Sequence, residues 1–196
     1  MPEDLEALKH GPAESGVDFR RGSGTVRRRR SMDPVAERIV GFLREIGLSV
    51  RLATLEEETF LPGVTLEPNG LVVDPDALKY PGDLLHEAGH LAVMLPEDRA
   101  KVNGNAGSDQ GYEIGAQCWS YAAAVHLGLE PGVVFHQDGY KGSAASLIQH
   151  YSGGLVGVPL LQWMGLTLDS ARAAVQGVAP YPAMVKWLRE DPSPAP

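Results

Sequence analysis

The pentapeptide His86-Glu87-Ala88-Gly89-His90, set inside the apolar run 84–95, constrains this chain more than any other segment. On a helix, two histidines four residues apart differ by about 40° in azimuth and about 6 Å in height, so both imidazoles can reach one ion from one face. A catalytic zinc takes three protein ligands and leaves a fourth position for water. Glu87 directly follows the first histidine and can lie beside that water. The pattern therefore supplies two metal ligands, His86 and His90, and a general base, Glu87.

The segment around this motif is apolar on almost every side, which is typical of a buried helix. Its apolar members are Leu84, Leu85, Ala88, Leu91, Ala92, Val93, Met94 and Leu95. Burying ionisable side chains without partners costs several kcal/mol, and a dication offsets that cost. We therefore predict one bound Zn²⁺ ion. The alternative is a helical domain in which the two histidines are hydrogen-bonded core residues without a metal.

Composition limits the remaining classes of protein. The 196 residues suffice for one compact domain, and 43% hydrophobic with 21% charged residues is ordinary for a globular protein. The net charge of -8 argues against a nucleic-acid partner for the folded part. Cys118 is the only cysteine, which excludes an intramolecular disulfide and favours a reducing compartment. We expect a cytoplasmic protein, because no N-terminal signal segment and no membrane-spanning stretch is recognisable.

Residues 1–31 differ in composition from the rest of the chain. They are rich in Gly, Pro, Ser and charge, and they end in the arginine run 27–30. We predict a disordered basic tail, with an arm that binds nucleic acid or an anionic surface as the alternative. Met32 follows directly and precedes a good helix start, so translation from Met32 is a second alternative.

The segment after this tail predicts a helix, a strand and a hairpin. Asp33 is a favoured helix cap before Pro34, and the apolar stripe that follows ends at Gly47. Pro68-Asn69-Gly70 is a strong turn signal between two short apolar runs. The expected elements are a helix over 34–46 and strands at 48–55, 64–66 and 71–73.

The rest of the chain reads as mostly helical. Pro96 ends the motif helix after Leu95, a polar loop follows over 96–109, and Gly128 ends the next apolar-striped helix. The expected helices are 83–95, 110–127, 143–151, 158–165, 169–176 and 182–190, with a polar Gly-bearing loop up to 142. Together with the short strands, this pattern predicts the α+β class: a small mixed sheet, two helices that carry the site, and a mostly helical C-terminal half.

A third metal ligand has to come from another element, and Glu113 is our choice. It lies 23 positions after His90 in the first turn of the next predicted helix, so the loop between them lets that helix turn back across the motif helix. A carboxylate is also favoured in a first turn by the helix dipole. Gln117, four residues later on the same face, is placed to hold a ligand imidazole. The other candidate ligands are Asp109, which is the main competitor, and the more distant His126 and His136.

This arrangement resembles the gluzincin branch of the zincin metallopeptidases. The strand, the His-Glu-x-Gly-His sequence and the Ala-rich helix that Glu113 opens are similar to those of the small bacterial minimal gluzincins, including the type that acts on phage or stress repressors. The resemblance covers about residues 70–128. It implies a mixed sheet beside the motif helix, with an edge strand at about 70–74 that pairs with an extended substrate. It also implies that residues 32–196 form a single zinc metallopeptidase-like domain.

The expected function is hydrolysis of a peptide bond in a peptide or protein substrate. Zinc held by His86, His90 and Glu113 activates water, and Glu87 takes the proton and passes it to the leaving amine. An endopeptidase is favoured over an aminopeptidase, because no further acidic motif for a free amino terminus is recognisable. A further oxyanion donor is expected, and the candidates for it, among which the sequence does not choose, are Tyr140, Tyr151, His136 and His150. The alternative function is a catalytically silent zinc-binding regulatory or interaction protein.

Overall fold

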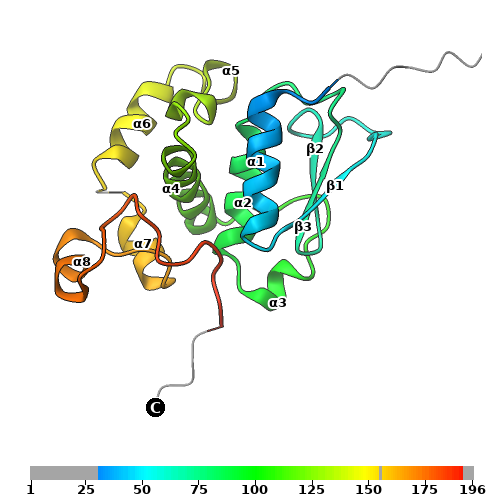
Figure 1. Cartoon of the computed structure of the whole chain (residues 1–196). Helices are drawn as coiled ribbons and strands as arrows, with labels where there is room; N and C mark the ends of the chain where they lie inside the picture. The colour runs from blue at the N-terminus through cyan, green and yellow to red at the C-terminus, as the bar shows by residue number, and fades with distance from the viewer. Residues whose placement is uncertain (1–30, 155, 192–196) are drawn as a thin grey trace, which may run out of the picture.

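The computed structural model describes residues 31–154 and 156–191 (Figure 1). Helices and a small three-stranded sheet make up this part of the chain, which confirms the predicted α+β class. The prediction of a disordered basic tail over 1–31, including the arginine run 27–30, lies outside the described residues except for Ser31. The C-terminal residues 192–196 also lie outside them.

The N-terminal elements form where the local signals predicted them. Asp33 caps the first helix, because its Oδ1 accepts hydrogen bonds from the backbone N–H of Val35 at 2.8 Å and of Ala36 at 3.2 Å. Asn69, in the two-residue turn of the hairpin, has φ +59°, a left-handed conformation that Asn tolerates. These elements are α1 (Pro34–Glu45), β1 (Ser49–Leu52), β2 (Val64–Glu67) and β3 (Gly70–Val73).

The strand order of the sheet is β1-β3-β2. β3 pairs in parallel with β1 and antiparallel with β2, so the sheet is mixed, as expected. The expectation of an edge strand at about 70–74 is wrong, because β3 has a partner on each side. β2 is the strand that lies at the edge beside the motif helix. The physical reason is the parallel pairing of β1 with β3. This pairing leaves β2, which lies between them in the sequence, at the outside of the sheet.

The motif helix α2 (Asp83–Val93) packs along α4 (Gln110–His126), and both were predicted. The contact is close because Gly89 of α2 faces the backbone of α4. A Cβ atom at Gly89 would lie 2.6 Å from the carbonyl oxygen of Ala116. Ser120 Oγ lies 3.0 Å from the carbonyl oxygen of Leu85 and so joins the two helices. Figure 1 shows α1 and α2 between the sheet and α4.

The expected loop 96–109 contains one short helix, α3 (Pro96–Arg99). Pro96 ends α2 but is also a favoured first residue of a new helix. The buried guanidinium of Arg99 donates to the carbonyl oxygens of Leu91 at 2.8 Å and Met94 at 3.0 Å. Those carbonyls lie at the end of α2, where intrahelical partners run out, so Arg99 takes the place of the missing donors.

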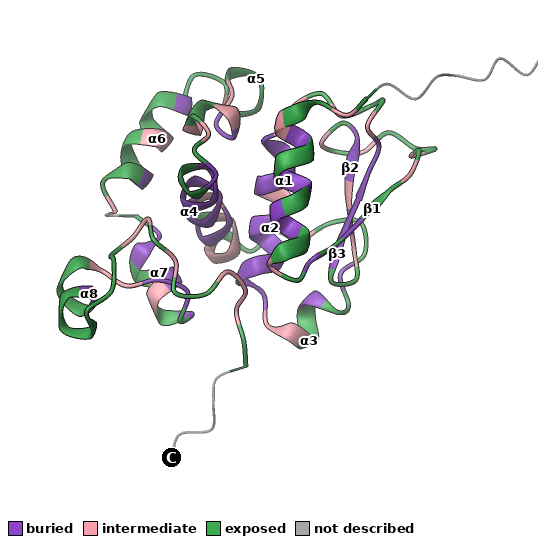
Figure 2. Ribbon diagram, in the orientation of Figure 1, coloured by how far each residue is buried: buried purple, intermediate pink, exposed green. Residues whose placement is uncertain are grey.

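Five short helical segments follow α4 on the side away from the sheet (Figure 1). Those near 143–151, 158–165 and 169–176 were predicted, and α5 lies in the expected polar loop. Their bounds are η1 (Pro131–Val133), α5 (Gln137–Tyr140), α6 (Ala144–Ser152), α7 (Val158–Trp163) and α8 (Ser170–Gln176). Figure 2 shows that α8 is mostly exposed, whereas α2 and α4 are largely buried.

The prediction of a helix over 182–190 is wrong, because this segment consists of turns and irregular backbone. Its backbone hydrogen bonds go to other parts of the fold: Val185 N–H bonds Leu166, and Arg189 N–H bonds Ala92. Trp187 packs edge-on against Phe42 with the ring centroids 4.9 Å apart. Aromatic packing and these cross-chain hydrogen bonds outweigh the local apolar pattern that favoured a helix.

The buried apolar residues form one cluster that extends from Ala36 to Leu166. Leu84, Leu85 and Leu91 of α2 are among its fully buried members, so the motif helix runs through the core. Cys118 is a buried free thiol, as its position on the apolar side of α4 predicts. Within the described residues, every helix is too short or too polar to cross a lipid bilayer.

Gly89→Ala should destabilise the protein by about 1–3 kcal/mol, because the added methyl group overlaps the backbone of α4. The free energy of unfolding from denaturant titration measures the effect. Gly41→Ala is the matched control, because a Cβ at this helical glycine meets nothing within 4 Å. That substitution should stabilise by roughly 0.5–1 kcal/mol through helix propensity. Equal stability of Gly89→Ala and wild type would contradict the close packing of the two helices.

Candidate metal centre

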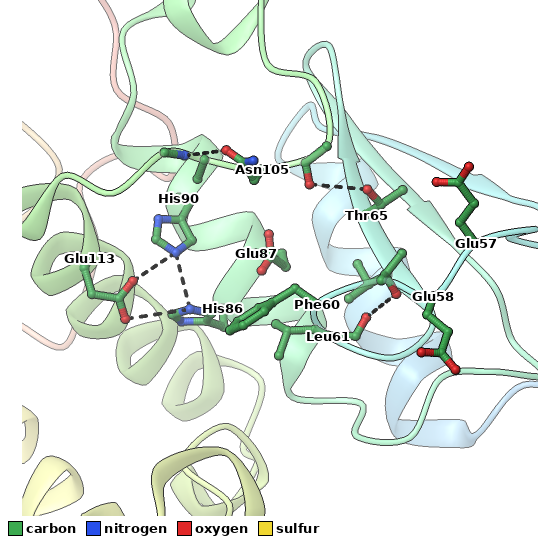
Figure 3. Close-up of a pocket in the computed structure, with 15 residues that line it drawn as sticks. Glu57, Glu58, Phe60, Leu61, Thr65, His86, Glu87, His90, Asn105 and Glu113 are labelled. Carbon is green, nitrogen blue, oxygen red and sulfur yellow. Dashed lines mark hydrogen bonds and ion pairs between the residues drawn. The ribbon is translucent and has the colours of Figure 1, made fainter.

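Three of the predicted site residues converge at the contact between α2 and α4 (Figure 3). His86 and His90 lie one turn apart on α2, and Glu113 lies in the first turn of α4. The two Nε2 atoms are 3.3 Å apart. Glu113 Oε2 lies 3.2 Å from Nε2 of His90, and Oε1 lies 3.8 Å from Nε2 of His86. One ligand atom from each residue can therefore be chosen so that all lie within 4.8 Å of one another, and the group is positioned to bind a metal ion.

The donor set also fits the size of a divalent transition-metal ion. Ligand bonds of about 2.0–2.1 Å arranged tetrahedrally place neighbouring donor atoms about 3.3–3.4 Å apart. The separations of 3.3 Å between the imidazole nitrogens and 3.2 Å between His90 and Glu113 match that spacing. Two imidazoles and one carboxylate supply three donors, which leaves a fourth position for water or substrate.

Asp109, the main competing ligand, lies outside this group. It is exposed and caps α4, because its Oδ1 accepts the backbone N–H of Tyr112 at 3.0 Å. His126 packs against Phe42 with the ring centroids 5.5 Å apart, and His136 contacts Asp83 instead of the cluster. The geometry therefore selects Glu113 from the candidates that the sequence left open.

Gln117 contacts the carboxylate ligand, and the expectation that it holds an imidazole is not met. Its Nε2 donates to Glu113 Oε1 at 2.6 Å. The hydroxyl of Tyr151 in turn donates to Gln117 Oε1 at 2.7 Å. Because Gln117 lies one turn after Glu113 on the same helix, its side chain reaches the carboxylate more readily than a ring on α2. This chain of hydrogen bonds fixes the orientation of Glu113.

Tyr140 reaches the other side of the cluster. Its hydroxyl oxygen lies 3.4 Å from Nδ1 of His86, at the edge of hydrogen-bonding distance. When Nε2 of a histidine binds a metal, Nδ1 carries the proton and needs an acceptor, a part that the Tyr140 hydroxyl can fill. Tyr140 and Tyr151 thus contact the cluster from behind, and neither is among the residues that line the cleft. His150 is exposed on α6.

Burial and charge set the protonation of two members of the cluster. Burial, together with the neighbouring His90, lowers the pKa of His86 to about 4, although the negative charge of Glu113 opposes the shift. The hydrogen bond with His90 holds the pKa of Glu113 at about 2. At neutral pH His86 is therefore neutral and Glu113 ionised, which are the forms that bind a metal ion.

Glu87 lines the same cleft but is not one of the three converging residues. Burial raises its pKa to about 7, and the negative charges of Asp83 and Glu113 act in the same direction, whereas His90 opposes them. A carboxylate with a pKa near neutrality can both accept and release a proton at physiological pH. Figure 3 shows its side chain beside the two histidines, facing the open space.

The cluster opens into a cleft of about 460 Å³. Its walls come from α2, from β2, from the loop between β1 and β2, and from the loop before α4. The residues that line it are Glu57, Glu58, Thr59, Phe60, Leu61, Val64, Thr65, His86, Glu87, His90, Gly104, Asn105, Ala106, Gly107 and Glu113.

Sequence reasoning missed the contribution of both loops. The acidic run 56–58 reads as a solvated loop, and 104–107 as a polar connection. One available signal was Phe60, a large aromatic residue outside every periodic apolar pattern. The other was the Gly- and Asn-rich composition directly before the helix that carries Glu113.

The sequence matches no family model, and comparison with curated proteins and with solved structures found no match either. The function of the site therefore has to be inferred from its own geometry.

Zinc should stabilise the metal-free protein. At a hundredfold excess over its dissociation constant we expect about 2.7 kcal/mol, or roughly a 5–10 °C rise in melting temperature. His90→Ala and Glu113→Gln should lose both this shift and the metal found by elemental analysis, because each removes one of three donors. His150→Ala, at an exposed histidine on α6, is the control and should keep both. Retention of zinc by His90→Ala would exclude this cluster as the binding site.

Tyr140→Phe should weaken zinc binding about tenfold, because Nδ1 of His86 loses the acceptor that orients the ring. Competition with a chromogenic chelator measures the dissociation constant. Tyr121→Phe is the control, since Tyr121 stacks on Tyr181 and has no contact with the cluster. An unchanged dissociation constant in Tyr140→Phe would show that this hydroxyl does not orient His86.

Proposed function

We propose that this protein is a zinc-dependent peptide-bond hydrolase of the gluzincin type. The observation that carries the proposal is the convergence of His86, His90 and Glu113 on one point, with Glu87 lining the same cleft. Two imidazoles and a carboxylate form the ligand set that catalytic zinc uses for hydrolysis. The acid that directly follows the first ligand stands where a general base is required.

Zinc is the metal that we propose for this site. Imidazole nitrogen suits zinc and other late transition metals, whereas magnesium and calcium prefer sites made entirely of oxygen. A three-donor set with an open fourth position is characteristic of catalytic zinc rather than of structural zinc, which takes four protein ligands. When bound, the ion supplies Lewis acidity, lowering the pKa of water and polarising the substrate carbonyl.

Glu87 is the proton carrier in this proposal. Its carboxylate accepts the proton that attacking water releases and delivers it to the nitrogen of the leaving amine. In the metal-free protein, burial raises the pKa of Glu87 to about 7, so at neutral pH neither accepting nor releasing a proton is strongly uphill. A bound dication would favour the ionised form of Glu87 and so prepare it to act as the base.

An extended peptide has a natural position along β2, the edge strand that lines the cleft. The pairing register points the backbone groups of Val64 and Leu66 away from β3. The carbonyl of Leu66 already accepts the N–H of Gly104 at 3.0 Å. The N–H of Val64 is also taken, because it bonds the carbonyl oxygen of Leu61 at 3.3 Å. We therefore place backbone pairing with the substrate at the carbonyl oxygen of Val64. A cleft open to a continuous peptide favours an endopeptidase.

Glu87→Gln should retain zinc and the wild-type melting temperature while peptide cleavage falls by at least about a hundredfold, because the amide cannot accept the proton. Digestion of a peptide library followed by mass spectrometry measures cleavage, and elemental analysis measures zinc. Glu97→Gln is the matched control, since Glu97 forms only an exposed ion pair with Lys101. Cleavage by Glu87→Gln at the wild-type rate would contradict the role of Glu87 as the general base. Zinc binding without cleavage by the wild type would favour a silent zinc-binding protein instead.

A further inference from the structure

Phe60 is 99% exposed, although it is one of the residues that line the cleft. Figure 3 shows its side chain reaching from the loop between β1 and β2 toward His86 and Glu87. Aromatic side chains normally bury most of their surface. A phenyl ring held in water beside a metal cluster therefore has apolar surface that a bound molecule can cover.

The loop that carries Phe60 is tied to the fold on both sides. Before Phe60, the N–H of Leu55 donates to Asp74 Oδ2 at 3.0 Å. Across Phe60, Thr59 Oγ1 donates to the carbonyl oxygen of Leu61 at 2.6 Å, and after it the N–H of Val64 bonds that same carbonyl at 3.3 Å. The ends of the loop are fixed by these contacts, so the ring is presented over the cleft by a defined backbone.

Gly63 closes this loop and cannot be replaced without moving it. Its φ of +81° is in the left-handed region, and a Cβ there would lie 2.2 Å from the backbone nitrogen of Leu78. The turn that positions Phe60 above the cleft is therefore fixed by a close backbone approach.

The surroundings of the ring define the chemistry of its occupant. Besides Phe60, the apolar residues that line the cleft are Leu61, Val64 and Ala106. Glu57 and Glu58 line the same cleft, and neither lysine nor arginine is among its described lining residues, so an acidic side chain would be repelled. An apolar side chain can cover the phenyl ring at no electrostatic cost.

We propose that Phe60 is a specificity-determining residue that covers an apolar or aromatic side chain of the peptide next to the bond that is cut. This inference rests on the proposed function, because it assigns a substrate class to the same cleft. Covering that side chain also removes water from the space beside Glu87.

The test uses zinc-loaded full-length protein and a library of short fluorescein-labelled peptides that vary at one central position. Binding is measured by fluorescence anisotropy in the Glu87→Gln background, and cleavage is measured as kcat/KM with Glu87 intact. Wild type should prefer Phe, Leu or Met over Ala at one position. Phe60→Ala should reduce that preference about tenfold to a hundredfold, the factor expected for losing one buried aromatic contact.

Two further variants separate specificity from folding. Phe60→Leu should restore most of the preference, because it returns apolar surface to the same place. Trp163 is another exposed aromatic residue: it is 71% exposed, contacts Arg189 and is not among the residues that line the cleft. Trp163→Ala should therefore leave the preference unchanged. Zinc content and melting temperature should be the same in all variants, since Phe60 makes little contact with the fold.

The outcomes distinguish this inference from the hydrolase proposal. An unchanged preference in Phe60→Ala, or an equal loss for every peptide, would overturn the role of Phe60 while leaving hydrolysis intact. Binding that depends on Phe60 without any cleavage by the wild type would overturn hydrolysis and support only the contact of Phe60 with an apolar side chain of a bound peptide. Absence of both binding and cleavage would overturn both proposals.

Discussion

The close approach of α2 and α4 is the constraint on which the site depends. Gly89 lets the backbone of α4 lie against α2 at the carbonyl of Ala116, and Ser120 joins the two helices at Leu85. Because α4 is held at this short distance, the carboxylate of Glu113 reaches both imidazoles of α2. A larger residue at position 89 would separate the helices and pull the third ligand away. The glycine within the motif is therefore a packing requirement of the cluster that is positioned to bind a metal ion.

The electrostatics of the site follow from that packing. Buried imidazoles beside a carboxylate are costly without compensation, and here contacts from behind support two of the three residues, whereas Nδ1 of His90 is buried without a hydrogen-bond partner among the described residues. Gln117 and Tyr151 hold Glu113, and Tyr140 lies against His86. These contacts come from α4, α6 and α5, so the mostly helical C-terminal half has a direct role in orienting the ligands. It is not only a cover for the core.

Around this rigid centre, loops form the walls of the cleft. The loop that carries Phe60 and the segment before α4 are fixed at their ends by backbone contacts to β2 and β3. Gly104 bonds Leu66 at the sheet edge, so the segment before α4 also determines which part of β2 is open to a peptide. The converging side chains therefore lie on helices, whereas loops supply much of the lining of the cleft.

The sequence by itself determined the elements whose signals are local. The cap at Asp33, the turn at Asn69 and the spacing of His86 and His90 are each set within a few residues, so α1, the hairpin and the two-histidine face of α2 could be predicted. Tertiary structure decided what depends on contacts distant in the chain: Glu113 rather than Asp109 beside the two histidines, β3 in the middle of the sheet, and Phe60 in the lining of the cleft. It also kept 182–190 from forming a helix, because Trp187 packs against Phe42 and the backbone bonds Leu166 and Ala92. Local sequence patterns determine which backbone conformation has a low free energy, but only the packing of the whole chain determines which distant groups come into contact.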